Sequence, residues 1–144
     1  MPLDRRQIIL AAMAAGGQDA TYLPVQVQKL FFLIDREAPA AFNGPHFNFQ
    51  PYDYGPFDKT VYECLDYLNA EGAVEVINNG RYRTYRLTPT GYQTGFAVLG
   101  GVSAPARDYL QRISQWIRTL SFQQLVTAIY ARFPDMKVNS VFRG

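Results

Sequence analysis

Residues 49–57, Phe-Gln-Pro-Tyr-Asp-Tyr-Gly-Pro-Phe, constrain the fold of this chain more than any other segment. The run is rich in aromatic residues, and its prolines and glycine restrict the backbone to turns and extended conformations. It stands directly before a strongly patterned helix that we expect over residues 57–71, so it sets the direction in which that helix leaves the domain. The expected helix has a net charge of −3, from Asp58, Glu63, Asp66, Glu71 and Lys59.

Hydrophobic periodicity and capping signals divide the first 100 residues into regular elements. We expect a β-hairpin joined at Asn79-Gly80, which is a tight-turn signal. The order helix, helix, strand, helix, β-hairpin is typical of winged-helix proteins. It predicts an α+β, mostly α fold with a winged-helix-like core over residues 1–100. The expected helices cover residues 4–15, 24–37, 57–71 and 88–100, and the expected strands cover residues 46–52, 73–77 and 82–87.

Residues 101–144 are expected to form a helical extension packed on the same core. Apolar spacing predicts helices over residues 104–120 and 122–133, and Pro134 ends the second of these. The tail after residue 136 still contains Val138, Val141 and Phe142, so part of it is expected to dock on the domain.

The net charge of +2 is too small to indicate nucleic-acid binding, but its distribution is uneven. Residues 1–100 carry a net charge of −2, and residues 101–144 carry +4. A single cysteine excludes an intrachain disulfide and favours a reducing compartment. No segment approaches the roughly 18 apolar residues of a membrane-spanning helix. We therefore expect a cytoplasmic protein without a cleaved signal.

Three segments together resemble a known group, the YwgA-like proteins, and more distantly the SocA-like (Panacea) antitoxin domain. These are Gln28-Lys29-Leu30-Phe31-Phe32, Tyr52-Asp53-Tyr54-Gly55-Pro56-Phe57 and Leu87-Thr88-Pro89-Thr90-Gly91. Both groups have a QKL-aromatic helix and a YGP turn ahead of a helix, and the resemblance covers residues 20–95. It implies a small bacterial or phage-borne domain that binds a partner protein, sometimes a toxin, in prokaryotic conflict or phage defence. Some relatives regulate transcription.

Enzyme chemistry has little support in the sequence, and we expect a non-enzymatic protein without a cofactor or metal. His46 and Cys64 are the only residues of their kinds, and no third group is indicated to orient them. Asp53 and Asp58 flank the YGP turn and could form an acid/base pair. The favoured roles are a cap of the turn for Asp53 and, for Asp58, a negative charge at the positive start of the following helix. No clustered ligands indicate a metal site.

Tyrosines around the YGP turn, with the acidic residues of the following helix, suit the capture of a basic partner protein. The same rings could instead pack the junction between strand and helix, and a planar small molecule could also stack there. The expected partner-binding residues are Tyr52, Tyr54, Asp58, Tyr62, Glu63 and Asp66.

The alternative function is a winged-helix DNA-binding transcriptional regulator. DNA binding through the acidic helix 57–71 is disfavoured, because affinity for DNA comes from neutralised phosphates. Arg107, Gln111, Ser114 and Arg118 share one face of helix 104–120, which is either solvated or contacts an acidic partner or a second copy of the chain. DNA contacts would come from the predicted wing and the basic C-terminal helices, through Arg81, Arg83, Arg86, Arg107 and Arg118.

Overall fold

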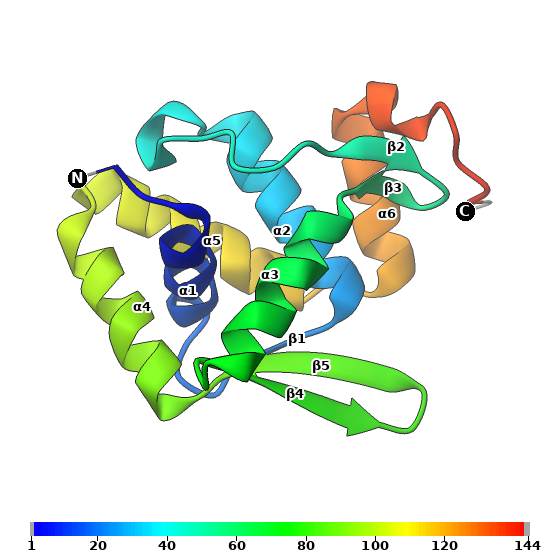
Figure 1. Cartoon of the computed structure of the whole chain (residues 1–144). Coiled ribbons are helices and arrows are strands. Elements are labelled where there is room, and N and C mark those ends of the chain that lie inside the picture. Colours follow the sequence, from blue (N-terminus) through cyan, green and yellow to red (C-terminus); the bar gives the residue numbers. More distant parts are fainter. Residues whose placement is uncertain (1, 143–144) are drawn as a thin grey trace.

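The computed structural model describes residues 2–142, apart from the side chains of Asn79 and Tyr82, so Arg143 of the basic C-terminal third lies outside the described residues. The fold is α+β and mostly helical (Figure 1). The helices are α1 (Arg5–Ala15), α2 (Pro24–Glu37), α3 (Lys59–Ala70), α4 (Pro89–Gly101), α5 (Ala104–Arg118) and α6 (Phe122–Arg132), with short 3-10 helices η1 (Ala40–Phe42) and η2 (Pro134–Lys137). The strands are β1 (Thr21–Tyr22), β2 (Gln50–Tyr52), β3 (Gly55–Phe57), β4 (Val74–Asn79) and β5 (Tyr82–Leu87). No helix in the described part of the chain is long and apolar enough to cross a bilayer.

Local capping sets the starts of most helices at the predicted places. Asp4 forms a capping box with Gln7 at α1, and Ser121 forms one with Gln124 at α6. The Thr88 hydroxyl accepts a hydrogen bond from the backbone N–H of Gly91 at the start of α4. The predicted positions of these helices are confirmed.

The larger sheet is antiparallel, with strand order β1-β5-β4. The sequence pattern does not predict β1, because two residues are too few for a period. Asn79 pairs with Tyr82, so the turn of the β4–β5 hairpin is Gly80-Arg81, one residue later than the predicted Asn79-Gly80. Gly80 has a φ of 66°, which glycine adopts without strain.

The segment before α3 differs from the prediction at both ends. A strand over residues 46–52 is wrong before Gln50, because the backbone N–H groups of His46 and Phe47 donate to the Asp35 carboxylate instead of to a neighbouring strand. A helix beginning at residue 57 is also wrong, because Phe57 ends β3 and pairs with Gln50. The YGP turn is therefore the tip and second strand of a small β2–β3 hairpin.

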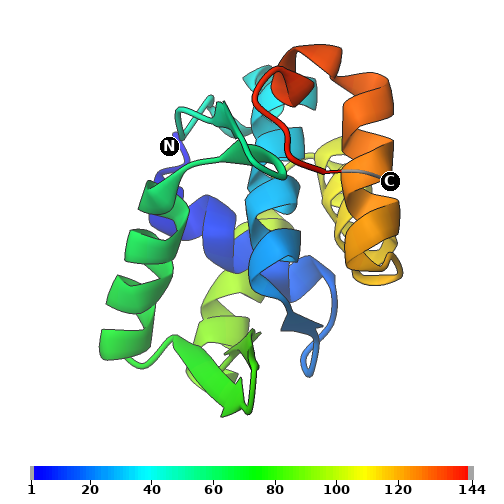
Figure 2. The same cartoon turned by 90° about the vertical axis from the view of Figure 1, so that its right-hand side faces the viewer.

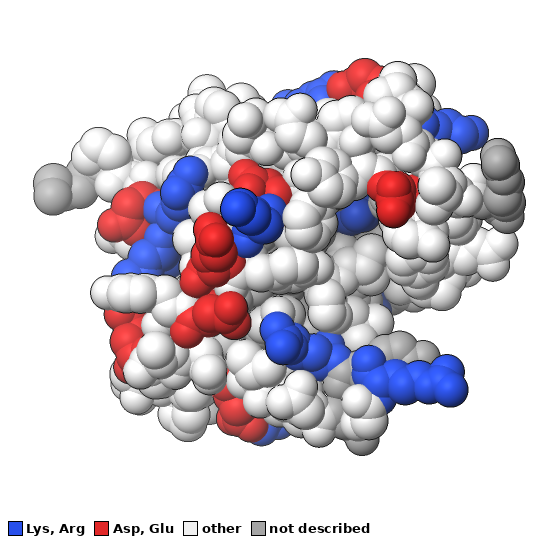
Figure 3. All heavy atoms as spheres, turned by 45° about the vertical axis from the view of Figure 1, so that its right-hand side comes forward, with Lys and Arg blue, Asp and Glu red and all other residues white. Residues whose placement is uncertain are grey.

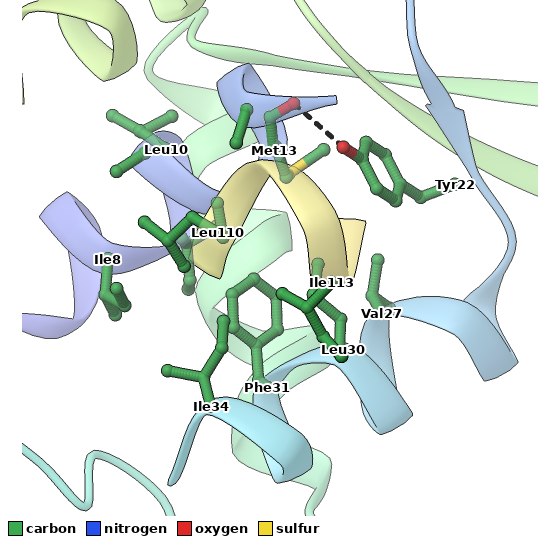
Figure 4. Close-up of a cluster of buried hydrophobic side chains, with 14 of the residues drawn as sticks. Ile8, Leu10, Met13, Tyr22, Val27, Leu30, Phe31, Ile34, Leu110 and Ile113 are labelled. Atoms are coloured by element: carbon green, nitrogen blue, oxygen red, sulfur yellow. Dashed lines mark hydrogen bonds between the residues drawn. The ribbon is translucent and has the colours of Figure 1, made fainter. Parts of the chain in front are cut away.

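The core surrounds α1. The sequence predicts one apolar face for this helix, yet every residue from Ile8 to Ala15 is buried, since α3, α4 and α5 all pack against it. Figure 4 shows side chains of α1, α2 and α5 meeting in this core, with the Tyr22 hydroxyl donating to the Met13 carbonyl at 2.9 Å. Gly95 of α4 approaches α1 closely, because a Cβ there would overlap the carbonyl oxygen of Leu10.

The C-terminal helices share this core. Leu110 of α5 and Leu125 of α6 are fully buried, and Figure 2 shows α2 between α3 and α6. The spacing predicts a solvated face of α5 that includes Ser114, but Ser114 is fully buried. Its hydroxyl lies 2.6 Å from that of Tyr22.

The tail docks on the β2–β3 hairpin through its backbone and on α6 through Phe142. The backbone N–H of Val141 donates to the Asp53 carbonyl at 2.9 Å, and the Phe142 ring lies 6.2 Å from that of Phe122. Val138 and Val141 keep exposed side chains, so docking of the tail is confirmed for Phe142 and for the backbone.

Candidate functional site

A pocket of about 360 Å³ opens beside the β2–β3 hairpin. We call it the hairpin pocket. Three segments that are distant in the sequence build its walls: the first half of α2, the hairpin with the following turns of α3, and the start of α6. Its lining is mostly apolar and aromatic, which is usual for ligand and partner sites. The lining residues are Pro24, Val25, Gln28, Lys29, Tyr52, Asp53, Tyr54, Gly55, Phe57, Tyr62 and Phe122.

One wall of the pocket is a series of aromatic rings in contact. Tyr52 stacks on Phe57 with ring centroids 5.1 Å apart, and Phe57 meets the edge of Tyr62 at 5.7 Å. Tyr62 is half-buried, its hydroxyl donates to the Pro24 carbonyl, and burial raises its pKa to about 12. The inner rings therefore pack the junction between strand and helix, whereas Tyr52 is 53% exposed.

The opposite wall joins the hairpin tip to α6. Tyr54 is 45% exposed and its ring lies 5.2 Å from that of Phe122, which is 42% exposed. Three large aromatic side chains thus stand partly in solvent around one opening. Such partly exposed rings next to a hollow are the side chains that most often anchor a binding partner.

Two neighbouring polar residues of α2 hold the hairpin in place. The Gln28 amide accepts from the backbone N–H of Asp58 and donates to its carbonyl, both at 3.0 Å. The Lys29 amine donates to the Pro56 carbonyl at 3.1 Å. Two of the segments that carry the family resemblance, the QKL helix and the YGP turn, are therefore in direct contact.

Lys29 is unusual because its side chain is buried at the base of the pocket. It is 4% exposed, and burial lowers the pKa of its amine to about 8. Within residues 2–142, no carboxylate oxygen lies within ion-pair distance of this amine.

The two aspartates beside the hairpin have different roles. The Asp58 carboxylate caps α3 by accepting a hydrogen bond from the backbone N–H of Thr60 at 2.9 Å. Its other oxygen accepts from the backbone N–H of Asn48, before the hairpin, at 2.8 Å. Burial works to raise the pKa of Asp58, but these hydrogen bonds outweigh it and hold the pKa below its ordinary value. The Asp53 carbonyl, not its carboxylate, carries the turn's hydrogen bonds, since it accepts from Val141, Ser140 and Tyr130. Asp58 thus lies at the start of α3, as the sequence predicts, and the structure shows that it is the N-cap of this helix.

The outer face of α3 is acidic. Glu63 and Asp66 are exposed, whereas Glu71 pairs with Arg6 at 2.6 Å. Figure 3 shows acidic side chains mainly over the left half of one face of the molecule, with basic side chains among them, and further basic side chains along the projection at the lower right. Charges of both signs therefore share this face.

The arginines named for DNA contact differ in their exposure and in their partners. Arg81 and Arg83 are exposed on the β4–β5 hairpin, whereas Arg86 pairs with Glu75 at 2.8 Å. Arg107 donates to the carbonyls of Leu99 and Val102, at the C-terminal end of α4. Arg118 donates to the carbonyls of Thr21 and Gly16, so both arginines of α5 satisfy backbone groups at neighbouring segments.

The residues considered for catalysis are not assembled into a site. The His46 ring donates to the Phe42 carbonyl at 2.6 Å, and no hydrogen bond within residues 2–142 joins it to Cys64. Cys64 is half-buried and burial raises the pKa of its thiol, which disfavours the nucleophilic thiolate. The described residues also contain no group of three or more His, Cys, Asp or Glu that could hold a metal ion.

Sequence reasoning assigns no site role to Lys29, Gln28 or Phe122. One signal was available: Gln28 and Lys29 stand between the apolar residues Val27 and Leu30 of the predicted helix 24–37. Polar side chains in such positions need buried partners. Phe122 carried no signal, because only the packing of α6 brings it beside Tyr54.

Comparison with models of protein families, with curated proteins and with solved structures finds no match for this chain.

Proposed function

We propose that this chain is a non-enzymatic protein-interaction module with a winged-helix-like core, similar to the YwgA-like and SocA-like (Panacea) antitoxin-type domains. Apart from the short η1 helix and the β2–β3 hairpin, which stand between α2 and α3, the elements follow the order α1-β1-α2-α3-β4-β5. This order and the sheet order β1-β5-β4 support this assignment of the core. In this role the chain binds a partner protein, such as the toxin or effector of a prokaryotic conflict or phage-defence system. The β4–β5 hairpin corresponds to the wing.

The observation that carries the proposal is the group of exposed aromatic rings around the hairpin pocket. Tyr52, Tyr54 and Phe122 present rigid apolar area at one opening, and aromatic anchors supply much of the energy of protein interfaces. Glu63 and Asp66 extend the surface along α3 with negative charge, which favours a basic partner. Asp58 and Tyr62 support this surface by holding the hairpin and α3 in position.

The test is capture of partners by the tagged protein from its native cells after nuclease treatment, read by mass spectrometry. We expect one stoichiometric protein that survives nuclease. Tyr54→Ala should weaken its affinity about tenfold, as loss of an interface anchor does. The double charge reversal Glu63→Lys with Asp66→Lys should weaken it further in low salt.

Phe96→Ala is the matched control, because Phe96 is also an exposed aromatic residue, 61% exposed, on α4 at the other side of the molecule (Figure 1). It should leave capture unchanged. A partner that is retained equally by wild type, Tyr54→Ala and the charge-reversed protein would refute binding through the hairpin and α3.

DNA binding is the second candidate, and the exposed arginines Arg81 and Arg83 of the β4–β5 hairpin favour it. A labelled duplex would then bind with an affinity that falls steeply between about 50 and 200 mM salt. Arg81→Ala with Arg83→Ala should reduce that salt dependence, whereas Arg112→Ala on α5 should not. Loss of every captured protein on nuclease treatment would place this function ahead of the first.

A further inference from the structure

Among residues 2–142, the buried amine of Lys29 has a hydrogen-bond acceptor but no anionic partner. An ammonium group has three donors, and the Pro56 carbonyl accepts one of them at 3.1 Å. Gly55 lies against the amine without a side chain, since a Cβ there would stand 3.8 Å from Nζ. A cation removed from water is costly unless an anion or several acceptors face it. The pocket therefore contains an unpaired positive charge at its base.

Other ionisable groups of the pocket lie nearer its mouth. Asp53, Tyr52 and Tyr54 are exposed on the hairpin, and the Tyr62 hydroxyl is bonded to the Pro24 carbonyl. No carboxylate oxygen of residues 2–142 lies within 4.0 Å of the Lys29 amine, so the charge is open to an anion from outside. Such an anion would restore the pKa of Lys29 toward its ordinary value, because the charged form would gain an ion pair.

We propose that the hairpin pocket binds the C-terminal residue of a partner chain, with its free α-carboxylate on Lys29 and a large apolar or aromatic side chain between Tyr54 and Tyr52. This inference rests on the proposed function, in which the hairpin face binds a partner protein. Capture of a terminal carboxylate is a known mode of peptide recognition. Charge-assisted hydrogen bonds of this type are also stronger than neutral ones.

Size and charge favour a chain terminus over an internal acidic residue. The cavity of about 360 Å³ is at the small end of ligand pockets, so it takes one large side chain with its end group and not a long segment. Asp53 at the mouth, with Glu63 and Asp66 on α3, repels a segment that carries several acidic side chains. A chain with one carboxylate at its end, and otherwise neutral or basic, satisfies both conditions.

The test compares two peptides on the wild-type protein, acetyl-Gly-Lys-Phe with a free carboxylate and the same peptide as its C-terminal amide. Dissociation constants come from NMR titration near pH 7. We expect the acid to bind about tenfold more tightly than the amide, because the ion pair with Lys29 is lost in the amide. Equal affinities would overturn the inference. Equally tight binding of 3-phenylpropionate would overturn the assignment to a chain terminus and indicate a small organic acid.

Lys29→Met should remove the preference for the acid, and Lys59→Met is the matched control because Lys59 is an exposed lysine at the start of α3. If Lys29→Met does not fold, the amine of wild-type Lys29 still decides the matter through its 13Cε resonance. Its pKa should rise when the acid peptide binds and stay unchanged with the amide. A pKa that does not respond to the acid would overturn the inference.

Failure here is distinguishable from failure of the proposed function. Loss of the captured partner on Tyr54→Ala, together with equal binding of acid and amide, would keep the interaction surface and refute the carboxylate site. A preference for the acid peptide that depends on Lys29, without any partner captured through Tyr54, would support the carboxylate site and refute the proposed function.

Discussion

Replacing Lys29 with methionine should change how the stability of this protein depends on pH. The native pKa of about 8 lies well below the ordinary value of 10.5, because the charged amine is buried. Between these values the native state has released the proton and the unfolded chain still holds it. Stability therefore rises as pH increases from about 8 toward 10.5, and this gain is lost again as pH falls from 10.5 to about 8.

The magnitude follows from the two pKa values. The full gap corresponds to about 3 kcal/mol, at about 1.36 kcal/mol per pKa unit. Between pH 7 and pH 10 the wild-type free energy of unfolding should gain about 2.5 kcal/mol relative to Lys29→Met. The variant also loses the hydrogen bond to the Pro56 carbonyl. This loss shifts the free energy of unfolding of the variant by nearly the same amount at each pH, so it does not change the pH dependence.

Urea denaturation followed by circular dichroism at pH 7, 8, 9 and 10 measures this difference. Tyr22, Tyr62 and Tyr109 have pKa values raised to about 12 by burial, so both proteins lose stability above pH 10, and the comparison stops there. Lys59→Met controls for the change in net charge. A difference between wild type and Lys29→Met that stays constant from pH 7 to 10 would show that Lys29 has an ordinary pKa and is well solvated.

Two further predictions concern the packing and capping that hold the site. Gly95→Ala should lower the free energy of unfolding by about 1–3 kcal/mol, measured by thermal unfolding. The new Cβ would overlap the Leu10 carbonyl and push α4 away from α1. Gly100→Ala in the same helix has no atom within 4 Å of the new Cβ and should be neutral or stabilising, so equal losses at both positions would refute the close approach. Asp58→Ala should cost about 1–2 kcal/mol through loss of the α3 cap. The native pKa of Asp58 is depressed, so wild type should lose this stability as pH falls through the native pKa of Asp58. Asp58→Asn should show no such loss in urea titrations at about pH 2 to 6. The same dependence on acid pH in wild type and Asp58→Asn would contradict the cap.

Helix positions were predictable because their signals are local. Asp4, Thr88 and Ser121 bond to backbone groups three residues further on, so the sequence shows both partners of each cap. The β4–β5 hairpin was predictable for the same reason, to within one residue at Gly80.

The segment before α3 was predicted poorly because its hydrogen bonds are not local. Asp35 takes the backbone N–H groups of His46 and Phe47 from 11 and 12 residues away, and Gln28 holds the backbone of Asp58 from 30 residues away. The Phe47 and Phe49 rings pack together, 5.8 Å apart, yet no spacing of apolar residues shows that side chains replace a strand as the partners of the backbone.

By itself, the sequence determined the helices of the domain, the β4–β5 hairpin and the aromatic character of the YGP turn, because each depends on residues a few positions apart. Only the tertiary structure decided which polar and charged side chains are bonded within the domain and which are available to a partner. It buried Ser114 against Tyr22 and placed Arg107 and Arg118 on backbone carbonyls. It also left Lys29 in a pocket where no carboxylate of residues 2–142 pairs with its amine. Those outcomes depend on contacts between residues far apart in the chain, whose free energies no local pattern contains.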